Sequence, residues 1–474
     1  MTVITNPGIF RAYDIRGRAG IELTPAFAEA LGAAFGTVIA ERIAAEAPDR
    51  AARVAIGRDC RPHGVELAAA FEQGVRRVGV DVLRLGMVPT PLVYFAIHHL
   101  ELDGGVAITG SHNPPAWNGF KLCDGPGSMH GEAIQRLRRI IEDDSQKTVP
   151  AAQQGGGEAF DLGPTYVKWH TARLAPLERR PTVVLDAGNG AGGPVGKALL
   201  EAMGAEVVPL FCAPDGQFPN HHPDPTVEAN LVDLKAAVKR HGADLGLALD
   251  GDADRLGAVD RHGRVVWGDQ LLLYFARRIL AETPGARIVG EVKCSRVLYD
   301  GVAAAGGVGE MWKVGHSLIK ARMKQTGAVL AGEMSGHLFF ADRYFGFDDG
   351  VYAAARLVEA VGAGGPTLDA FVDGLPPTVT TPELRVACPD RAKFAVAQRA
   401  AAHFAARYAT TDIDGVRIDF PHGWGLLRPS NTQPVLVMRF EADSAERLMA
   451  YRAEVEAWLR SAAPEVDLEA DTHH

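Results

Sequence analysis

The sequence predicts a multidomain α/β protein, and three observations support this prediction. The chain has 474 residues, which is enough for three or four domains of about 100–200 residues each. Short apolar runs alternate with stretches whose apolar residues recur at helical spacing, a pattern typical of helices layered on mostly parallel sheets. Three successive segments also share one design, a strand that runs into a polar loop and then a helix, although no repeat of fixed period links them.

Composition limits the partners that we expect. The formal net charge is −9 and the sequence pI is about 6.0, so no overall field attracts nucleic acid or an anionic membrane. The five cysteines include no CxxC pair, which indicates a reducing compartment and neither a disulfide framework nor a structural zinc site. We see no secretory signal and no apolar run of transmembrane length. We therefore expect a cytoplasmic protein that binds neither nucleic acid nor membranes.

In the first segment, residues 1–155, a strand ends in a serine loop. The apolar run 105–108 predicts a buried strand, and residues 109–115 follow it as Thr-Gly-Ser-His-Asn-Pro-Pro. Ser111 beside His112 is a candidate nucleophile or phosphate carrier, with an ordinary polar turn as the alternative. Ligands of such sheets bind beyond the carboxyl ends of the strands, where Ser111 would lie. Lys121 could contact a phosphate or transfer a proton, or could be a surface lysine.

The second segment, residues 156–263, contains a glycine-rich turn and an acidic loop. The turn at 186–193 lacks GxGxxG spacing and a P-loop lysine, so a tight strand-to-helix turn is favoured over a phosphate site. Asp250, Asp252 and Asp254 follow the apolar strand 245–249. Three close carboxylates require a cation, and hard oxygen ligands suit Mg²⁺. The alternative is a solvated acidic turn, but the preceding strand and Arg255 favour a metal site.

The third and fourth segments, residues 264–375 and 376–474, each contribute one candidate loop. Glu333 and Ser335 alternate on an extended loop and could bind two neighbouring sugar hydroxyls. His316 stands in a loop that could face a ligand or could merely start a helix. The fourth segment carries an arginine, hydroxyls and an amide before a strand, which could form an anion cradle or an ordinary turn; these residues are Arg428, Ser430, Asn431 and Thr432.

Five motifs in order carry a family resemblance. FRAYDIRG, TGSHNPP, DGDADR, GEMSGH and RPSNTQP lie between residues 10 and 434. Together they resemble the α-D-phosphohexomutase family in its bacterial phosphomannomutase/phosphoglucomutase branch. The resemblance implies four domains around a central cleft. Three are related α/β domains with mixed sheets, and a smaller α+β domain follows at the C-terminus, with the segment boundaries given above.

The resemblance also implies roles for individual residues. Ser111 would be the phosphoserine, and its phosphoryl oxygen would join Asp250, Asp252 and Asp254 around one Mg²⁺. Glu333 and Ser335 would hold sugar hydroxyls with His337 beside them. The phosphate that is not reacting would be held by Arg428, Ser430, Asn431 and Thr432. Further matches to cleft residues of the family are Tyr13, Arg16, Lys121, Arg255, Lys293 and His316.

The implied reaction interconverts a hexose 6-phosphate and the 1-phosphate, of mannose or glucose or both, through a 1,6-bisphosphate that turns end for end. Glucose 1,6-bisphosphate would be the activator, and the enzyme would be a monomer. The proton of the attacking hydroxyl could pass to Lys121, His112 or Arg16, and the sequence does not rank these three.

Three alternatives remain open at this stage. Phosphoglucosamine mutase belongs to the same family, although Met334 at the centre of the sugar loop favours the mannose/glucose branch. A Mg²⁺-dependent sugar phosphatase would pass the phosphoryl group to water. A silent sugar-phosphate-binding protein is disfavoured, because Ser111 and the aspartates are all present.

Overall fold

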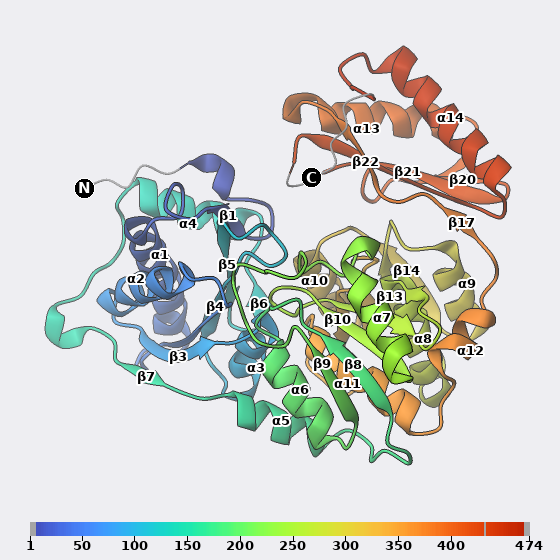
Figure 1. The fold of residues 1–474 in the computed structure, drawn as a ribbon. Coiled ribbons are helices and arrows are strands. Elements are labelled where there is room, and N and C mark those ends of the chain that lie inside the picture. The colour runs from blue at the N-terminus through green and yellow to red at the C-terminus, as the bar shows by residue number, and fades with distance from the viewer. Residues whose placement is uncertain (1–5, 431–432, 469–474) are drawn as a thin grey trace.

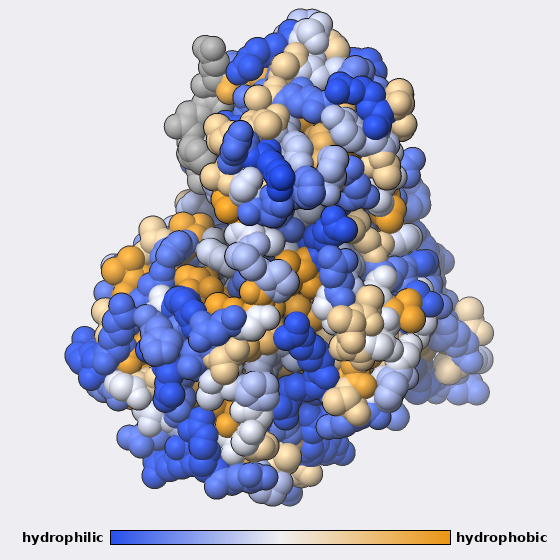
Figure 2. All heavy atoms as spheres, turned by 90° about the vertical axis from the view of Figure 1, so that its right-hand side faces the viewer, coloured by the Kyte–Doolittle hydropathy of each residue, from blue (hydrophilic) through white to orange (hydrophobic). Residues whose placement is uncertain are grey.

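The computed structural model describes residues 6–430 and 433–468, which form four sheets with their covering helices. The first domain lies on the left of Figure 1, and the second and third domains lie together beside it. The fourth forms a separate lobe above the others (Figures 1 and 2). No helix among the described residues is both long and apolar enough to cross a membrane.

The first sheet has the strand order β1-β5-β4-β2-β3-β7, with β6 paired to β5. Its central strand β2 is buried on both faces, because Val54 and Ile56 join the core beneath α1 and α2 while Ala55 joins the core beneath α3. The elements are η1 Pro7–Ile9, β1 Ile15–Arg18, α1 Pro25–Glu46, β2 Arg53–Arg58, α2 Gly64–Arg77, β3 Asp81–Met87, α3 Thr90–His99, β4 Gly104–Ile108, β5 Trp117–Asp124, β6 Gly127–Ser128, α4 Glu132–Glu142, η2 Ala151–Gln153 and β7 Gly157–Ala159.

The second sheet has the order β12-β11-β10-β8-β9. Strands β9, β8 and β10 run parallel, and β11 returns antiparallel to β10. The elements are α5 Gly163–Thr171, β8 Thr182–Asp186, α6 Gly193–Ala202, β9 Glu206–Leu210, η3 Glu228–Leu231, α7 Val232–His241, β10 Leu245–Leu249, β11 Leu256–Asp260 and β12 Val265–Val266.

The third sheet has the order β14-β13-β15-β16, with β16 antiparallel to β15 and the other neighbours parallel. The elements are α8 Gly268–Glu282, β13 Arg287–Glu291, α9 Arg296–Ala304, β14 Val308–Trp312, α10 His316–Thr326, β15 Leu330–Gly332, β16 Leu338–Phe340, α11 Gly350–Gly362 and α12 Leu368–Asp373.

These three sheets share one four-stranded core. In each, three parallel strands are followed by one antiparallel strand, in the orders β3-β2-β4-β5, β9-β8-β10-β11 and β14-β13-β15-β16. The relation between the three segments is therefore structural, although no repeat is visible in the residues.

The fourth domain is an antiparallel sheet with two helices on one face (Figure 1). It has its own core beneath α13 and α14. On the other side, Trp424 and Leu426 pack against Val292 of the third domain. Its elements are β17 Val379–Thr380, β18 Leu384–Ala387, α13 Asp390–Ala405, β19 Ala409–Thr411, β20 Val416–Phe420, β21 Gly423–Pro429, β22 Val435–Ala442 and α14 Ala445–Ala462.

The predicted fold class is thus confirmed: three related α/β domains with mixed sheets precede a smaller α+β domain. The predicted segment boundaries stay predictions. Near the first of them, β7 lies past residue 155 and adds to the edge of the first sheet by pairing with β3.

Candidate active site

Three loops at equivalent places in the three related sheets carry most of the predicted site residues. Residues 109–116 join β4 to β5, residues 250–255 join β10 to β11, and residues 333–337 join β15 to β16. After each of these three loops the chain returns as an antiparallel strand. The predicted strand–loop–helix design is found elsewhere in the same sheets, where β2, β8 and β13 are followed by α2, α6 and α9. The loops meet: Ser111 Oγ donates to Asp250 Oδ2 at 2.9 Å, and Arg255 forms a β-bridge with His337.

Ser111 lies in this meeting point with its hydroxyl directed at the aspartate loop. The residue is buried, and its φ of 49° places it in the left-handed region, which is strained for a residue with a side chain. His112 Nδ1 lies 3.1 Å from Ser111 Oγ. Burial lowers the pKa of His112 well below its ordinary value, so the ring is neutral at pH 7. The hydroxyl therefore has a carboxylate and a neutral imidazole as neighbours.

The aspartate loop has the donor set of a metal site. Asp250, Asp252 and Asp254 are fully buried, and their oxygens lie within 4.8 Å of one another. Burial, together with the two neighbouring carboxylates, raises the pKa of Asp250 well above its ordinary value. Asp252 Oδ1 and Asp254 Oδ1 have no hydrogen-bond partner among the described residues. Orphaned buried carboxylate oxygens fit a hard divalent cation such as Mg²⁺; a solvated acidic turn does not fit this burial.

Lys121 reaches the same aspartates from β5. Its Nζ lies 2.7 Å from Asp252 Oδ2 and 2.5 Å from Asp254 Oδ2. Burial alone would lower the pKa of Lys121, but the three aspartates outweigh burial and raise it. Lys121 is therefore an ammonium at neutral pH, and the reading of Lys121 as a surface lysine is wrong because its side chain is buried.

Two predicted residues of the FRAYDIRG segment lie around the serine loop and the third domain. Arg16 Nη2 pairs with Asp14 at 2.6 Å, and its Nη1 donates to Asn113 Oδ1 of the serine loop at 3.3 Å. The Tyr13 hydroxyl donates to the Val314 carbonyl at 3.0 Å. This segment therefore links the serine loop to the loop before His316.

The loop of residues 333–337, called the sugar loop for its predicted role, is held in place by its neighbours in the third domain. Glu333 Oε1 accepts from the Gly315 N–H at 2.7 Å, and the residue is buried. His337 Nε2 accepts from Arg255 Nε at 3.1 Å, so the aspartate loop and the sugar loop also contact through side chains. Ser335 is partly exposed on the same loop. Glu333 thus lies 3.9 Å from His337, which contacts the aspartate loop through Arg255.

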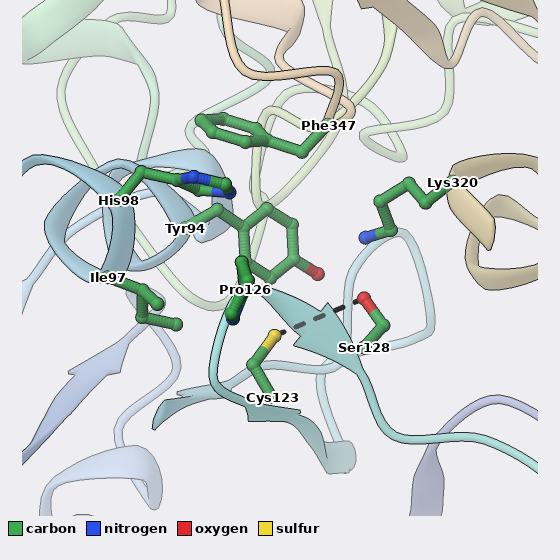
Figure 3. Close-up of a pocket in the computed structure, with 8 residues that line it drawn as sticks. All are labelled: Tyr94, Ile97, His98, Cys123, Pro126, Ser128, Lys320 and Phe347. Carbon is green, nitrogen blue, oxygen red and sulfur yellow. Dashed lines mark hydrogen bonds between the residues drawn. The ribbon is translucent and has the colours of Figure 1, made fainter. Parts of the chain in front are cut away.

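A carboxylate that no motif indicates, Asp348, joins His316 and His337. Asp348 Oδ2 lies 3.4 Å from His316 Nδ1 and 3.2 Å from His337 Nδ1, and Lys320 Nζ lies 2.9 Å from Oδ1. Burial alone would raise the pKa of Asp348, but Lys320 and His316 outweigh it and hold that pKa well below its ordinary value. Figure 3 shows Lys320 on one side of Tyr94, in a small pocket where α3 of the first domain meets α10. This pocket lies at the joint of the two domains.

Two predicted cations, Arg428 of the fourth domain and Lys293 of the third, are already paired with carboxylates. Arg428 Nη2 lies 3.0 Å from Asp414 Oδ2, and the Ser430 hydroxyl accepts from the Gln433 N–H at 3.2 Å. In the third domain, Lys293 Nζ lies 3.2 Å from Glu383 Oε2. Asp414 also accepts from the Val314 N–H at 3.1 Å, which links Arg428 to the loop before His316. Asn431 and Thr432, the other two predicted phosphate ligands, lie outside the described residues.

The glycine-rich turn 186–193 is held by its own surroundings. Asn189 donates to the Ala213 carbonyl at 2.9 Å, and His221 Nε2 lies 3.1 Å from Asp186 Oδ2. A Cβ on Gly188 would lie 3.0 Å from Pro223. These contacts favour the structural interpretation of this turn.

Comparison with known proteins agrees with the geometry. The chain matches the phosphoglucomutase/phosphomannomutase models of α/β/α domains I, II and III over residues 7–148, 165–263 and 267–379. It matches the C-terminal domain of the same family over residues 383–457. It is 47% identical, over 442 residues and 93% of each chain, to a phosphomannomutase/phosphoglucomutase of Pseudomonas aeruginosa.

Solved structures show the same likeness. A phosphoglucomutase/phosphomannomutase family protein from Burkholderia thailandensis matches with a TM-score of 0.89 and 42% identity, over 98% of this chain and 99% of that one. An N-acetylphosphoglucosamine mutase of Aspergillus fumigatus, in complex with GlcNAc-6P and magnesium, shares the fold alone. Its TM-score is 0.56 at 15% identity, over 89% of this chain and 80% of that one.

Proposed function

The chain belongs to the phosphoglucomutase/phosphomannomutase family, and from this premise we propose that it interconverts hexose 6-phosphates and hexose 1-phosphates of mannose, glucose or both. The proposed route runs through a phosphoserine at Ser111 and a hexose 1,6-bisphosphate. The single observation that carries the proposal is the 2.9 Å contact between Ser111 Oγ and Asp250, at the point where three equivalent loops meet. The protein is accordingly an isomerase.

The proposed reaction consists of two phosphoryl transfers, and in each one a P–O bond breaks as another forms. In the first transfer, the bond between phosphorus and Ser111 Oγ breaks while phosphorus bonds to the free hydroxyl oxygen of the sugar phosphate. The hydroxyl proton leaves, and Ser111 Oγ ends as a hydroxyl. After the bisphosphate has turned, the second transfer returns the other phosphoryl group to Ser111, and the Ser111 proton goes to the sugar oxygen that is released.

The residues divide this work between positioning and charge. Lys121, which is buried, and Arg255, which is partly buried, are both cationic and would face the negative charge that spreads over the transferring oxygens. Glu333 and Ser335 would accept and donate hydrogen bonds to sugar hydroxyls. Arg428, Ser430, Asn431 and Thr432 would hold the distal phosphate, with Lys293, His316 and Tyr13 nearby.

Two of the three candidates for the acceptor of the hydroxyl proton are disfavoured by their protonation states. Lys121 is held as an ammonium by the aspartates, and an arginine such as Arg16 keeps its protons in proteins. His112, a neutral imidazole 3.1 Å from Ser111 Oγ, remains from the three candidates.

We assign one Mg²⁺ per chain to Asp250, Asp252, Asp254 and a phosphoryl oxygen on Ser111. When bound, the ion would offset negative charge on the phosphoryl group. The orphaned oxygens of Asp252 and Asp254 support this assignment. Glucose 1,6-bisphosphate would act as activator by phosphorylating Ser111.

Four further points complete the proposal. The domains would divide at residues 155/156, 263/264 and 375/376, close to the limits of the four matched segments, although β7 and β12 pair with the sheets of the domains that precede them. We also propose that the enzyme is a cytoplasmic monomer whose ligands are small sugar phosphates. The five cysteines, all free, support a reducing compartment.

Phosphoglucosamine mutase activity remains the alternative within the family. A Mg²⁺-dependent sugar phosphatase, in which water would take the phosphoryl group from Ser111, remains a second alternative.

A coupled assay tests the proposed function. Purified protein with Mg²⁺ receives glucose, mannose or glucosamine 1-phosphate, each with and without a trace of glucose 1,6-bisphosphate. We expect the 6-phosphates of glucose or mannose to form faster with the trace. Dominant turnover of glucosamine 1-phosphate would favour the alternative, and release of inorganic phosphate as fast as isomer formation would support a phosphatase.

A further inference from the structure

An ion pair lies buried beneath the serine loop and belongs to none of the motifs that carry the family resemblance. Asp59 and Arg61 follow β2, and their side chains are 1% and 0% exposed. Arg61 Nε donates to Asp59 Oδ2 at 3.1 Å. A fully buried ion pair is costly unless further hydrogen bonds satisfy both partners, so the other contacts of the pair are informative.

Arg61 satisfies the carbonyl groups of the serine loop. Its Nη2 donates to the carbonyls of Ser111 at 2.9 Å and Asn113 at 2.5 Å. Its Nη1 donates to the carbonyls of Pro114 at 2.7 Å and Trp117 at 3.1 Å. Four carbonyls that converge inside the protein need four donors. The planar guanidinium offers five in a fixed fork, whereas lysine offers three from a single point.

Asp59 holds the amide side of Ser111, opposite the carbonyl that Arg61 binds. Its Oδ2 accepts from the Thr109 hydroxyl at 2.8 Å and from the Gly110 N–H at 3.1 Å. The Thr109 hydroxyl in turn accepts from the Ser111 N–H at 2.8 Å. The amide side of Ser111 is thus tied to Asp59 and its carbonyl side to Arg61, which over-determines the strained φ of 49°.

The space around the pair is filled from both domains. A Cβ on Gly110 would lie 2.6 Å from Arg61 Cζ, so only glycine fits there without moving the guanidinium. From the second domain, a Cβ on Gly216 would lie 2.6 Å from Arg61 Cα. The Phe218 ring centroid lies 5.0 Å from Arg61 Cζ. The ion pair is therefore closed in at the joint of the two domains that supply Ser111 and the aspartates.

We propose that Asp59 and Arg61 are positioning residues for phosphoryl transfer, which fix the backbone of Ser111 so that Oγ is held against the aspartate loop. Neither side chain touches the substrate. They act through the serine loop, and the proposal rests on the proposed function of Ser111 as phosphoryl carrier.

Gly110→Ala tests this role without removing a charge. The added methyl group displaces the Arg61 guanidinium, and Gly64→Ala is the matched control, because a Cβ there meets nothing closer than 3.5 Å. We expect kcat for glucose 1-phosphate to fall by at least about tenfold in Gly110→Ala, since small misplacements of a reacting group cost rate. The KM should stay within about twofold. Arg61→Lys, which keeps the charge and loses the fork, should show the same split.

A second readout separates positioning from simple damage. Enzyme labelled on Ser111 with ³²P is mixed with glucose 1-phosphate, and the share of label passed to sugar is compared with the share released as inorganic phosphate. In Gly110→Ala and Arg61→Lys, a displaced phosphoserine should lose a larger share of its label to water than the wild type does. In the control, Gly64→Ala, this share should equal that of the wild type. A change in folded fraction alone would lower the total signal and leave this ratio unchanged.

The outcomes are distinct for the two proposals. Wild-type enzyme that converts no hexose phosphate would refute the proposed function. Active wild type, with Gly110→Ala and Arg61→Lys matching it in kcat and in the label ratio, would refute the positioning role alone. A rise in KM at unchanged kcat, or a loss of activity that only follows the loss of folded protein in thermal melts, would also overturn it.

Discussion

The serine–aspartate site and the Arg428 loop would both serve phosphate groups, but they are built in opposite ways. At the first, three buried carboxylates gather on one loop, and Lys121 and Ser111 reach them from another domain. At the second, a single guanidinium is paired with Asp414 of its own domain. Buried acids dominate the first site, and a cation with one orienting acid characterises the second.

The difference follows from where each phosphate comes from. In the proposed reaction, the phosphate on Ser111 would belong to the enzyme, so the opposing site would need carboxylates that bind a divalent cation. The distal phosphate would arrive with the substrate, so its site would need a cation that is held in place but still has N–H groups free to donate. Changes at the first site should therefore lower kcat, and changes at the second should raise KM.

Ser111→Ala should produce the largest effect. Loss of the phosphoryl carrier should lower turnover by about 10⁴-fold or more, as for removal of other covalent nucleophiles. Binding of glucose 1-phosphate, measured by calorimetry, should change by less than about threefold because the distal site is intact. Ser145→Ala, on an exposed serine after α4, is the control. Unchanged turnover would refute the carrier role.

Asp252→Asn should come next. Asp252 accepts from Thr90 Oγ1 at 2.6 Å and from Lys121 at 2.7 Å, so its loss disturbs both the cation site and Lys121. We expect kcat to fall by about 10²–10³-fold and the Mg²⁺ concentration for half-maximal activity to rise. Asp233→Asn, on the exposed start of α7, should leave both values unchanged. Full activity of the wild type after chelation would contradict a metal site.

The residues of the first candidate site could be selected from the sequence because their signal is local. Three alternate aspartates after an apolar strand are visible without knowledge of the fold, as is a serine between glycine and histidine. The return strands β5, β11 and β16 were not predicted, because a short mixed run does not reveal the direction of a strand. Their antiparallel pairing depends on contacts between distant segments.

Single charged residues that act through tertiary contacts were also missed. Asp348 meets His316 and His337 from a part of the chain with no motif. Arg61 reaches the Ser111 carbonyl across 50 positions in sequence. One signal was available: Asp59 and Arg61 follow an apolar strand directly, where a buried charge needs a partner.

Arg428→Lys tests the second side of the comparison. The Nε and Nη2 groups of Arg428 are engaged by Asp414, which leaves Nη1 to donate to a phosphate. Lysine keeps the charge but loses the fork. We expect the KM for glucose 1-phosphate to rise by about tenfold with kcat changed less than about threefold. Arg407→Lys, at an exposed pair with Glu454, is the control. A dominant fall in kcat would break the comparison.

Asp414→Asn should have a smaller effect of the same kind, since it loosens the guanidinium without removing it. A rise in KM of about threefold is expected. If Asp414 acts only through Arg428, the double variant with Arg428→Lys should be no worse than Arg428→Lys alone. Additive effects on KM would show instead that Asp414 contributes independently.

The smallest effect concerns acid stability at Lys293. Its ammonium lowers the pKa of Glu383 to about 2. Because this folded-state pKa lies below the ordinary value of 4.5, the stabilisation is complete above that value and is lost as pH falls toward 2. At pH 6, the melting temperature of Glu383→Gln should therefore be lower than that of the wild type. The difference between the two melting temperatures should become smaller at pH 3.5. Glu446→Gln, on exposed α14, should show no such difference. A difference in melting temperature that grows on acidification would mean that Glu383 does not pair with Lys293 as a carboxylate.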